Sequence, residues 1–257
     1  MSYTISAVDR ALLLLEALAE TPDSGLSELA EKTGFTKTLI FRLLYTLEVR
    51  GFVTKDAARR TYSLSWRAML LGDKARQQSK LMSAADPQMD ELRSQTGCNV
   101  SVQIRDGLHS VVVALRRGVQ EQRIFAEIGR RGPLHAGGGP KILLAFAPQE
   151  VREAVLASDL ARYTPSTMID PERLSAALAT IRRDGWVMSE GELDHSTCSV
   201  AIPIYDSNSD VAAALAVTGK TELLPPEKRG HVLDLLREAG SKITRLVGAH
   251  AAGVPKP

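Results

Sequence analysis

The strongest constraint on the fold comes from residues 25–60, which read GLSELAEKTGFTKTLIFRLLYTLEVRGFVTKDAARR. A short helix is expected to open at residues 26–27 with Ser27 as its N-cap, because hydroxyl side chains accept hydrogen bonds from a first turn. Gly34 ends this helix, since glycine takes a positive φ without steric cost. A second helix is expected from Thr36, its N-cap, to Arg50, and Gly51 stops it.

The second helix has two chemically different faces. One face is apolar at helical spacing and is expected to meet a core through Leu39, Ile40, Leu43, Leu44 and Leu47. The opposite face carries Lys37, Thr38, Phe41, Arg42 and Tyr45. This pattern is typical of a helix-turn-helix whose second helix enters the major groove of DNA. An ordinary helical hairpin in a globular core is the alternative.

The charge distribution favours the DNA-binding alternative. Residues 32–80 contain eleven basic residues and three acidic ones, a net charge of +8, whereas residues 1–31 carry one basic residue and six acidic ones. The positive field is therefore local, as a phosphate-binding surface requires. The whole chain has a formal charge of only +2, so its total charge alone would not indicate nucleic acid.

A β-ribbon is expected directly after Gly51. Residues 52–54 and 61–64 alternate as two strands around a turn at 55–60, with Arg59 and Arg60 at its tip. This is the wing of a winged helix, and arginine suits both phosphates and the minor groove. A solvated basic turn remains the alternative.

Individual side chains can be assigned expected roles at DNA. Lys37 and Thr38 stand at the start of the second helix, within reach of base edges and phosphates. Arg42 follows one turn later and can pair with guanine or a phosphate. Phe41 and Tyr45 either touch a thymine methyl or a phosphate, or are partly buried. The predicted DNA-binding residues are Ser27, Thr36, Lys37, Thr38, Phe41, Arg42, Arg59 and Arg60.

Helices are expected on both sides of this motif. Residues 6–20, with Ser6 as the N-cap, form an amphipathic helix whose apolar stripe is too broad for one partner, so that part of it meets another subunit. A helix at 66–80 is expected to bury Trp66, Met69 and Leu70. A further helix at 82–95 is expected to break near Asp86-Pro87. The domain prediction is a DNA-binding domain at 1–65, a helical linker at 66–96, a second domain at 97–250 and a frayed tail at 251–257.

The second half changes to an alternation of strands and helices. Its expected strands are 99–104, 110–115, 124–128, 186–190, 199–205 and 211–218, and its expected helices are 140–146, 149–157, 171–184 and 227–247. Asp106-Gly107 predicts a hairpin turn. The fold class is therefore α+β in two domains, the second an α/β sheet covered by helices.

A run of three glycines precedes the helix expected at 140–146. Such a run exposes backbone N–H groups at the positive end of a helix dipole, which suits a carboxylate or a phosphate. The Walker spacing of a nucleotide loop is absent, and a plain loop is the alternative. Nearby His135 is expected to be structural. His195 is expected in a solvated loop, with an effector acid as its other possible partner, and Met188 in the core or a pocket wall.

Several classes of protein are disfavoured. The first twenty residues lack a basic start and contain Glu16, so they do not form a signal peptide, and no window is apolar enough for a membrane helix. The two cysteines, Cys98 and Cys198, lack zinc-site spacing, although one bridge between them stays possible. The nucleophile-elbow, zinc-protease and dinucleotide motifs are all missing. We therefore expect a cytoplasmic, non-enzymatic protein without metal or cofactor. The alternative is a small-molecule-binding or catalytic α/β domain whose basic N-terminal part only mediates association.

Taken together, the chain resembles the IclR-type bacterial transcription regulators. The matching segments are SAVDRALLLLEALAE, LSELAEKTGFTKTLIFRLLYTLEVRGFV, YSLS, PLHAGGGPKILLAF, RYTPSTMID, IRRDGWVMSEGE, SVAIPIYD and VAAALAVTG. They follow the family's order along nearly the whole chain. The resemblance implies a winged helix-turn-helix, a linker helix and a GAF-like effector-binding domain. It also implies a repressor or activator that acts as a homodimer or homotetramer on double-stranded operator DNA.

The resemblance further implies a small organic effector, a carboxylate or an aromatic acid. By position, the effector-binding residues would be Ser101, Ala136, Gly137, Gly138, Gly139, Ser189, Glu190, Glu192, Ser199, Ala216 and Thr218. The chain departs from the family at Pro140, where glycine is frequent, and in its acidic run, here Ser189-Glu190-Gly191-Glu192. The family's cysteine aligns with Ser199, while Cys198 stands one position earlier. Because adjacent strand residues face opposite ways, Ser199 and not Cys198 is expected at the pocket.

Overall fold

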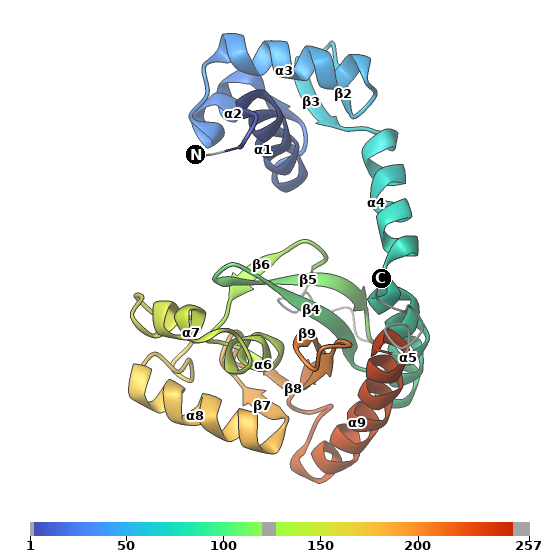
Figure 1. Cartoon of the computed structure of the whole chain (residues 1–257), viewed down its shortest axis with the longest axis vertical. Coiled ribbons are helices and arrows are strands. Elements are labelled where there is room, and N and C mark those ends of the chain that lie inside the picture. The colour runs from blue at the N-terminus through green and yellow to red at the C-terminus, as the bar shows by residue number, and fades with distance from the viewer. Residues whose placement is uncertain (1–2, 120–126, 249–257) are drawn as a thin grey trace, which may run out of the picture. The chain divides into compact units, whose positions relative to one another are not determined.

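The computed structural model describes residues 3–119 and 127–248 and divides into two compact units (Figure 1). The boundary falls between Ser79 and Lys80. The helical linker expected at 66–96 is therefore divided, with its first helix in the first unit and its second helix in the second. The tail expected at 251–257 and residues 249–250 lie outside the described residues.

The first unit contains the expected helix-turn-helix and wing. Its elements are α1 (Ser6–Glu20), β1 (Ser24–Gly25), α2 (Leu26–Thr33), α3 (Lys37–Val49), β2 (Val53–Asp56), β3 (Thr61–Leu64) and α4 (Trp66–Gln78). The strands form an antiparallel sheet in the order β1-β3-β2. Both helices of the motif pack on α1, and they meet each other through the turn at Gly34.

The turn chemistry explains where the helices of the motif begin and end. Gly34 ends α2 in the left-handed region at φ 70°. The Thr36 side chain accepts a hydrogen bond from the Leu39 N–H at 3.3 Å, as an N-cap should. The predicted cap at Ser27 is wrong, because α2 begins one residue earlier with Gly25 as its cap. Ser6 is likewise not a cap but the first residue of α1.

The core of the first unit is small and comes from α1, α2, α3, β2 and β3. Its buried residues are Leu14, Ala17, Leu18, Leu29, Ile40, Leu44, Val53 and Tyr62. α4 buries none of its side chains, and Trp66 and Met69 are 56% and 62% exposed. The prediction that Trp66, Met69 and Leu70 lie in the core is therefore wrong. Their helical spacing marks one apolar face of α4, but spacing alone does not say what covers that face.

The second unit is a six-stranded antiparallel sheet with helices on both faces. Its strands are β4 (Asn99–Asp106), β5 (His109–Arg116), β6 (Arg131–Pro133), β7 (Val187–Glu190), β8 (Thr197–Tyr205) and β9 (Val211–Lys220), in the order β6-β5-β4-β9-β8-β7. Its helices are α5 (Lys80–Thr96), α6 (Gly138–Ala145), α7 (Gln149–Leu156), α8 (Pro171–Asp184) and α9 (Pro226–Gly248). Figure 1 shows α5 and α9 on one side of the sheet and α6, α7 and α8 on the other.

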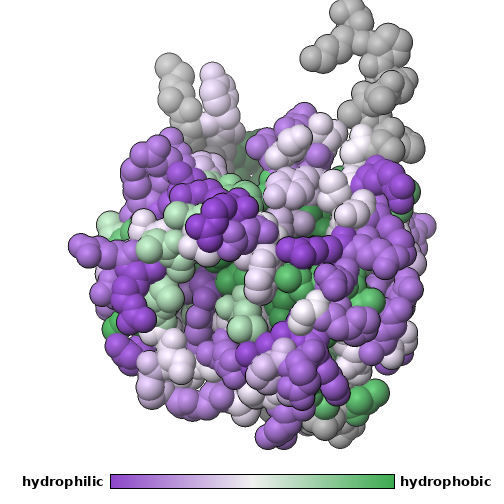
Figure 2. All heavy atoms as spheres, turned by 90° about the horizontal axis from the view of Figure 1, so that it is seen from below, coloured by the Kyte–Doolittle hydropathy of each residue, from purple (hydrophilic) through white to green (hydrophobic). Residues whose placement is uncertain are grey.

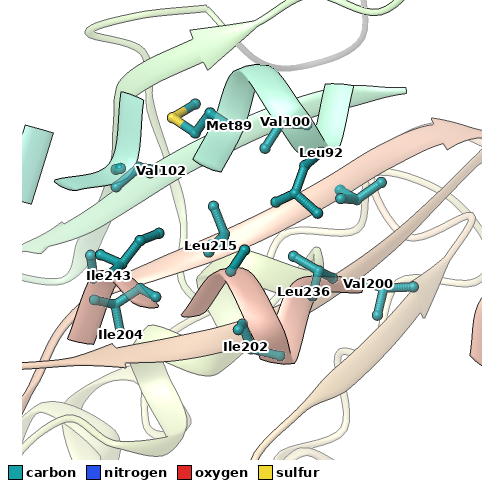
Figure 3. Close-up of a cluster of buried hydrophobic side chains, with 14 of the residues drawn as sticks. Met89, Leu92, Val100, Val102, Val200, Ile202, Ile204, Leu215, Leu236 and Ile243 are labelled. Atoms are coloured by element: carbon teal, nitrogen blue, oxygen red, sulfur yellow. The ribbon is translucent and has the colours of Figure 1, made fainter. Parts of the chain in front are cut away.

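α5 and α9 cover the first face of the sheet with a large apolar core. Figure 3 shows Met89 and Leu92 of α5 and Leu236 and Ile243 of α9 over branched residues of β4, β8 and β9. The break expected at Asp86-Pro87 is wrong, since α5 runs through Pro87 as one helix. α5 buries Met82, Ala84 and Ala85 before the proline and Met89 and Leu92 after it, and this packing outweighs the proline's cost of roughly 3 kcal/mol.

α6 lies on the second face of the sheet and is buried along its whole length. It packs on β4, β8 and β9, where Ala201, Ala214 and Ala216 point toward it, and α8 covers its outer side. Small side chains on the sheet allow α6 to approach the strands closely. The face seen in Figure 2 is mostly hydrophilic, with hydrophobic residues visible among the hydrophilic ones.

Two local features differ from the sequence-based expectation. The segment ahead of the glycines, for which no strand was predicted, contains the short edge strand β6, which pairs with β5. Residues 124–126 of the strand expected at 124–128 lie outside the described residues, and Glu127 and Ile128 are not in a strand. The Asp106-Gly107 hairpin is present, with Gly107 at φ 59°.

The two cysteines are free and buried, so the possible bridge between them is absent. Burial raises the pKa of both thiols, which keeps them protonated at neutral pH. Cys198 points into the core under α5 and α9, on the opposite face of β8 from Ala201. Among the described residues, no helix is long and apolar enough to cross a membrane.

Candidate DNA-binding surface and ligand pocket

The outer face of α3 is fully accessible. Ile40 and Leu44 are buried beneath it, whereas the predicted DNA-binding residues of this segment are all exposed: Thr36, Lys37, Thr38, Phe41 and Arg42. Ser27 is exposed on α2. Arg59 and Arg60 are exposed in the turn between β2 and β3. The structure therefore places every one of these residues at the surface of one unit.

The wing turn is held in shape by Asp56. Its carboxylate accepts hydrogen bonds from the N–H groups of Ala58 and Arg59 at 2.9 and 3.0 Å, and it lies 4.0 Å from the Arg59 guanidinium. Arg60 adopts a left-handed backbone conformation at φ 57°, which is uncommon for a side chain of this size. A fixed turn thus carries two exposed arginines.

A cavity of approximately 150 Å³ lies in the second unit where the start of α6 meets the sheet. Seven of the predicted effector-binding residues line it: Gly137, Gly138, Gly139, Ser189, Glu192, Ser199 and Thr218. A volume of this size suits a ligand with roughly one six-membered ring. The cavity brings together side chains from β7, β8 and β9 that are far apart in the sequence.

Four predicted residues do not line the cavity. Ala136 and Ala216 are fully buried beside it. Ser101 accepts a hydrogen bond from the Gln103 amide at 3.1 Å, so it supports a lining residue. Glu190 pairs with Arg229 at 3.0 Å on the opposite face of β7 from Ser189. The strand alternation that separates Ser189 from Glu190 is the same rule that separates Ser199 from Cys198.

The glycines at the start of α6 are required by close approach to the sheet. A Cβ on Gly138 would lie 2.8 Å from the Ser199 Oγ, and one on Gly139 would lie 2.7 Å from the Gln103 Oε1. Gly137 has φ 92°, which favours glycine for a different reason. The N–H groups of a first helical turn have no partner within the helix. Gly138 and Gly139 both line the cavity.

Glu192 is bonded to the beginning of α6. Its carboxylate accepts a hydrogen bond from the Gly137 N–H at 3.0 Å and from the Lys141 ammonium at 2.5 Å. The side chains of Lys141 and Glu192 are only 4% and 8% exposed, so this is a buried ion pair. A carboxylate of the protein thus already bonds to Gly137, the N-cap residue of α6, in the glycine run that the sequence indicated as suited to a carboxylate or a phosphate.

A short segment after α7 fixes the loop that carries Glu192. Thr164 and Thr167 donate hydrogen bonds to the carbonyls of Gly191 and Glu192 at 2.5 and 2.7 Å. His135 is bonded to the Ala161 carbonyl at 2.9 Å and stacks on Tyr163. The structural role expected for His135 agrees with these contacts. Hydrogen bonds therefore hold both the loop that carries Glu192 and the segment that leads into α6.

Some residues that line the cavity were not predicted from the sequence. They include Gln103, Ser110, Arg130, Arg131, Tyr163 and Thr197. Strand alternation would have found two of them, because Gln103 lies two residues after Ser101 and Thr197 two before Ser199. The two arginines follow the residues that are not described, and nothing in their spacing indicated the cavity.

Other candidate residues take no part in the cavity. His195 is exposed in the loop after β7, which is the solvated position expected for it. Met188 is 38% exposed, so its prediction as core or pocket wall is wrong. The Asp194 carboxylate accepts hydrogen bonds from Ser196, which lower its pKa. These bonds give Asp194 a structural role in the turn after β7. No cluster of metal-binding side chains occurs among the described residues.

Comparison with known proteins connects both units to one family. The model of the IclR helix-turn-helix domain matches residues 7–57, and that of the bacterial transcriptional regulator IclR C-terminal domain matches residues 74–245. The HTH-type transcriptional regulator KipR of Bacillus subtilis is 29% identical over 242 residues, which cover 94% of this chain and 96% of KipR.

Solved structures agree with this match. The IclR transcriptional regulator from Alicyclobacillus acidocaldarius has a TM-score of 0.89 and 26% identity, covering 96% of this chain and 100% of that one. An IclR homologue from Microbacterium hydrocarbonoxydans, complexed with 4-hydroxybenzoate, shares the fold with a TM-score of 0.83 at 23% identity, covering 95% and 99% of the two chains. The chain therefore belongs to the IclR family of bacterial transcriptional regulators, with a DNA-binding winged helix-turn-helix and a C-terminal α/β effector domain, and it is not an enzyme.

Proposed function

We propose that this regulator binds operator DNA in the cytoplasm and that a small organic acid in the α6 cavity controls this binding. The observation that carries the proposal is the cavity itself, which opens against three glycines at the start of a buried helix. The DNA contacts would come from the predicted residues of α3 and the wing. Lys37, Thr38 and Arg42 would meet base edges and phosphates, and Arg59 and Arg60 the flanking backbone.

The lining favours an acid for a physical reason. The first-turn N–H groups of Gly138 and Gly139 stand at the positive end of α6, and Arg130 and Arg131 also line the cavity. The Arg131 guanidinium is paired with Asp106. Glu192 already takes the Gly137 N–H and the Lys141 charge. The effector carboxylate would therefore use the next two amides, while its body would lie against the apolar part of the lining.

The rest of the cavity sets the character of that body. Val112, Pro133 and Leu193 supply apolar surface, and Ser110, Ser189 and Ser199 supply hydroxyl groups. A compact acid with a ring or a short chain and one or two hydroxyl groups matches this mixture. Its size is limited to roughly one ring by the cavity volume. The acid bound by the Microbacterium homologue makes 4-hydroxybenzoate a reasonable first probe.

The control would act by a shift between two states. An effector changes DNA binding only by its differential affinity for the DNA-bound and DNA-free arrangements. To test the function, an operator is selected from random duplexes with the intact protein, and its binding is followed by fluorescence anisotropy. A panel of small acids, including 4-hydroxybenzoate, is then titrated. We expect at least one acid to change operator affinity. The absence of any sequence-selective duplex would contradict the proposal.

We also propose that the protein is a homodimer or homotetramer held in part by the exposed apolar face of α4. Met69 and Leu70 lie one turn after Trp66 on this face, and an exposed apolar helix face is typical of a partner surface. We expect Met69→Glu to shift the protein toward monomers and to weaken operator binding, as measured by light scattering and anisotropy.

The neighbouring Leu71 offers a matched control. It is exposed and apolar on the same helix, but it lies away from the line of Trp66, Met69 and Leu70. Leu71→Glu should leave the oligomeric state unchanged. If both variants keep the mass of the parent protein, α4 does not form the interface.

A further inference from the structure

Two aromatic side chains occupy the middle of the outer face of α3. Phe41 and Tyr45 are 49% and 62% exposed and lie one helical turn apart, so they share one face of α3. Lys37 and Arg42 are exposed on the same outer face. This face therefore combines a central apolar strip with cationic side chains.

The core of the first unit does not explain these rings. α3 packs inward through Ile40 and Leu44, with Leu43 and Leu47 beside them, and neither aromatic residue belongs to that cluster. Within the described part of the chain, neither ring stacks on another aromatic residue, and the Tyr45 hydroxyl makes no hydrogen bond. Neither Phe41 nor Tyr45 is therefore part of the core, although about half of Phe41 is covered.

The chemistry of phenylalanine narrows what Phe41 can contact at DNA. Its ring has no donor or acceptor, so it forms no hydrogen bond with a phosphate or with the polar edge of a base. In the major groove, only thymine presents an apolar group, its C5 methyl. Lys37 and Arg42 supply positive charge for the phosphates on either side of the groove.

We propose that Phe41 is a specificity-determining residue that packs against the C5 methyl of a thymine in the operator. The Tyr45 ring continues the same apolar strip deeper along α3, and its hydroxyl reaches a phosphate or a polar base edge. The inference rests on DNA binding by the helix-turn-helix of this family and is independent of the effector proposal. A failure of effector control would leave it untouched.

The test removes single methyl groups from the DNA. An operator selected from random duplexes by the intact protein is resynthesised with each thymine replaced in turn by deoxyuridine, which lacks only the methyl group. We expect at least one position at which the parent protein binds about fourfold more weakly, the factor that corresponds to burial of one methyl-sized group. In Phe41→Ala the same substitution should have no effect, because the partner of the methyl is gone.

Two variants separate a contact with the methyl group from other effects. Lys37→Ala removes an expected phosphate contact, and Phe41→Leu removes the ring but keeps an apolar side chain. Lys37→Ala should weaken binding to the thymine and uracil duplexes by the same factor, since a phosphate contact does not sense the methyl. Phe41→Leu should keep part of the uracil penalty because its side chain is still apolar. Each variant should unfold at the same temperature as the parent, since the changes are at the surface.

Three results would overturn the proposal. The parent protein could bind all uracil duplexes as tightly as the thymine duplex. A uracil penalty could persist unchanged in Phe41→Ala, which would assign the methyl contact to another residue. Finally, Phe41→Ala could alter the oligomeric state in light scattering without altering any uracil penalty, which would make this strip a contact between copies of the chain.

Discussion

Glu192→Gln is expected to lower the free energy of unfolding of the second unit by roughly 3–5 kcal/mol, the cost of leaving a buried charge without its partner. The Lys141 ammonium is 4% exposed and has Glu192 as its ion-pair partner. The neutral amide would still accept a hydrogen bond from Gly137, so the loss reports the charge pair itself. Since domains are stable by only about 5–15 kcal/mol, the effect is large.

The measurement is urea unfolding followed by tryptophan fluorescence. In a Trp66→Phe background, Trp186 reports the second unit alone, because the chain has only these two tryptophans. Lys141→Met combined with Glu192→Gln should recover much of the loss, since no buried charge then remains. Asp184→Asn breaks an exposed pair with Arg183 and should leave the midpoint unchanged. If Glu192→Gln alone were as stable as the parent protein, the pair of Lys141 and Glu192 would be hydrated rather than buried.

Ser199→Leu is expected to abolish the effector response while operator affinity stays the same. Ser199 lines the cavity, and its hydroxyl accepts a hydrogen bond from Thr218 at 3.0 Å. The larger side chain would fill the space toward Gly138, where even a methyl group would be too close to the serine. We expect the half-saturating effector concentration to rise by about 100-fold or more, which corresponds to ~2.7 kcal/mol.

The adjacent residue provides the control for this prediction. Cys198 points to the opposite face of β8, into the core under α5 and α9. Cys198→Ala should cost some stability but keep the dose response, as measured by anisotropy on the selected operator. Ser199→Ala, which leaves the space open, should bind the effector with reduced affinity. An unchanged dose response in Ser199→Leu would remove Ser199 from the effector site.

The helix-turn-helix could be predicted from the sequence because its determinants are local. Gly34 and Thr36 act through their own turn, and the apolar spacing of α3 sets which face is buried. The opposite facing of Cys198 and Ser199 followed from strand alternation in the same way. Predictions were wrong where tertiary packing outweighed the local conformational preference of a residue. Pro87 favours a helix break, but the core residues of α5 on both sides of it hold the helix together.

The second kind of error concerns what covers an apolar or charged group. The spacing of Trp66, Met69 and Leu70 indicates a helix face but does not distinguish an internal core from a partner surface. The buried pair of Lys141 and Glu192 joins residues 51 positions apart, and no local rule predicts it. Seven of the eleven predicted effector residues line the cavity, because their positions in the family's motifs could be matched in this sequence. The lining residues that were not predicted come from strands and loops that carry no such motif.

The most direct test of the account is linkage between the cavity and the operator. Isothermal titration of the active acid is carried out on the free protein and on its complex with the selected operator duplex. If the cavity controls DNA binding, the acid's affinity must differ between the two by the same factor by which the acid changes operator affinity. We predict equal factors in the parent protein and an acid affinity lowered by about 100-fold or more in Ser199→Leu. Equal acid affinity with and without operator would contradict the account.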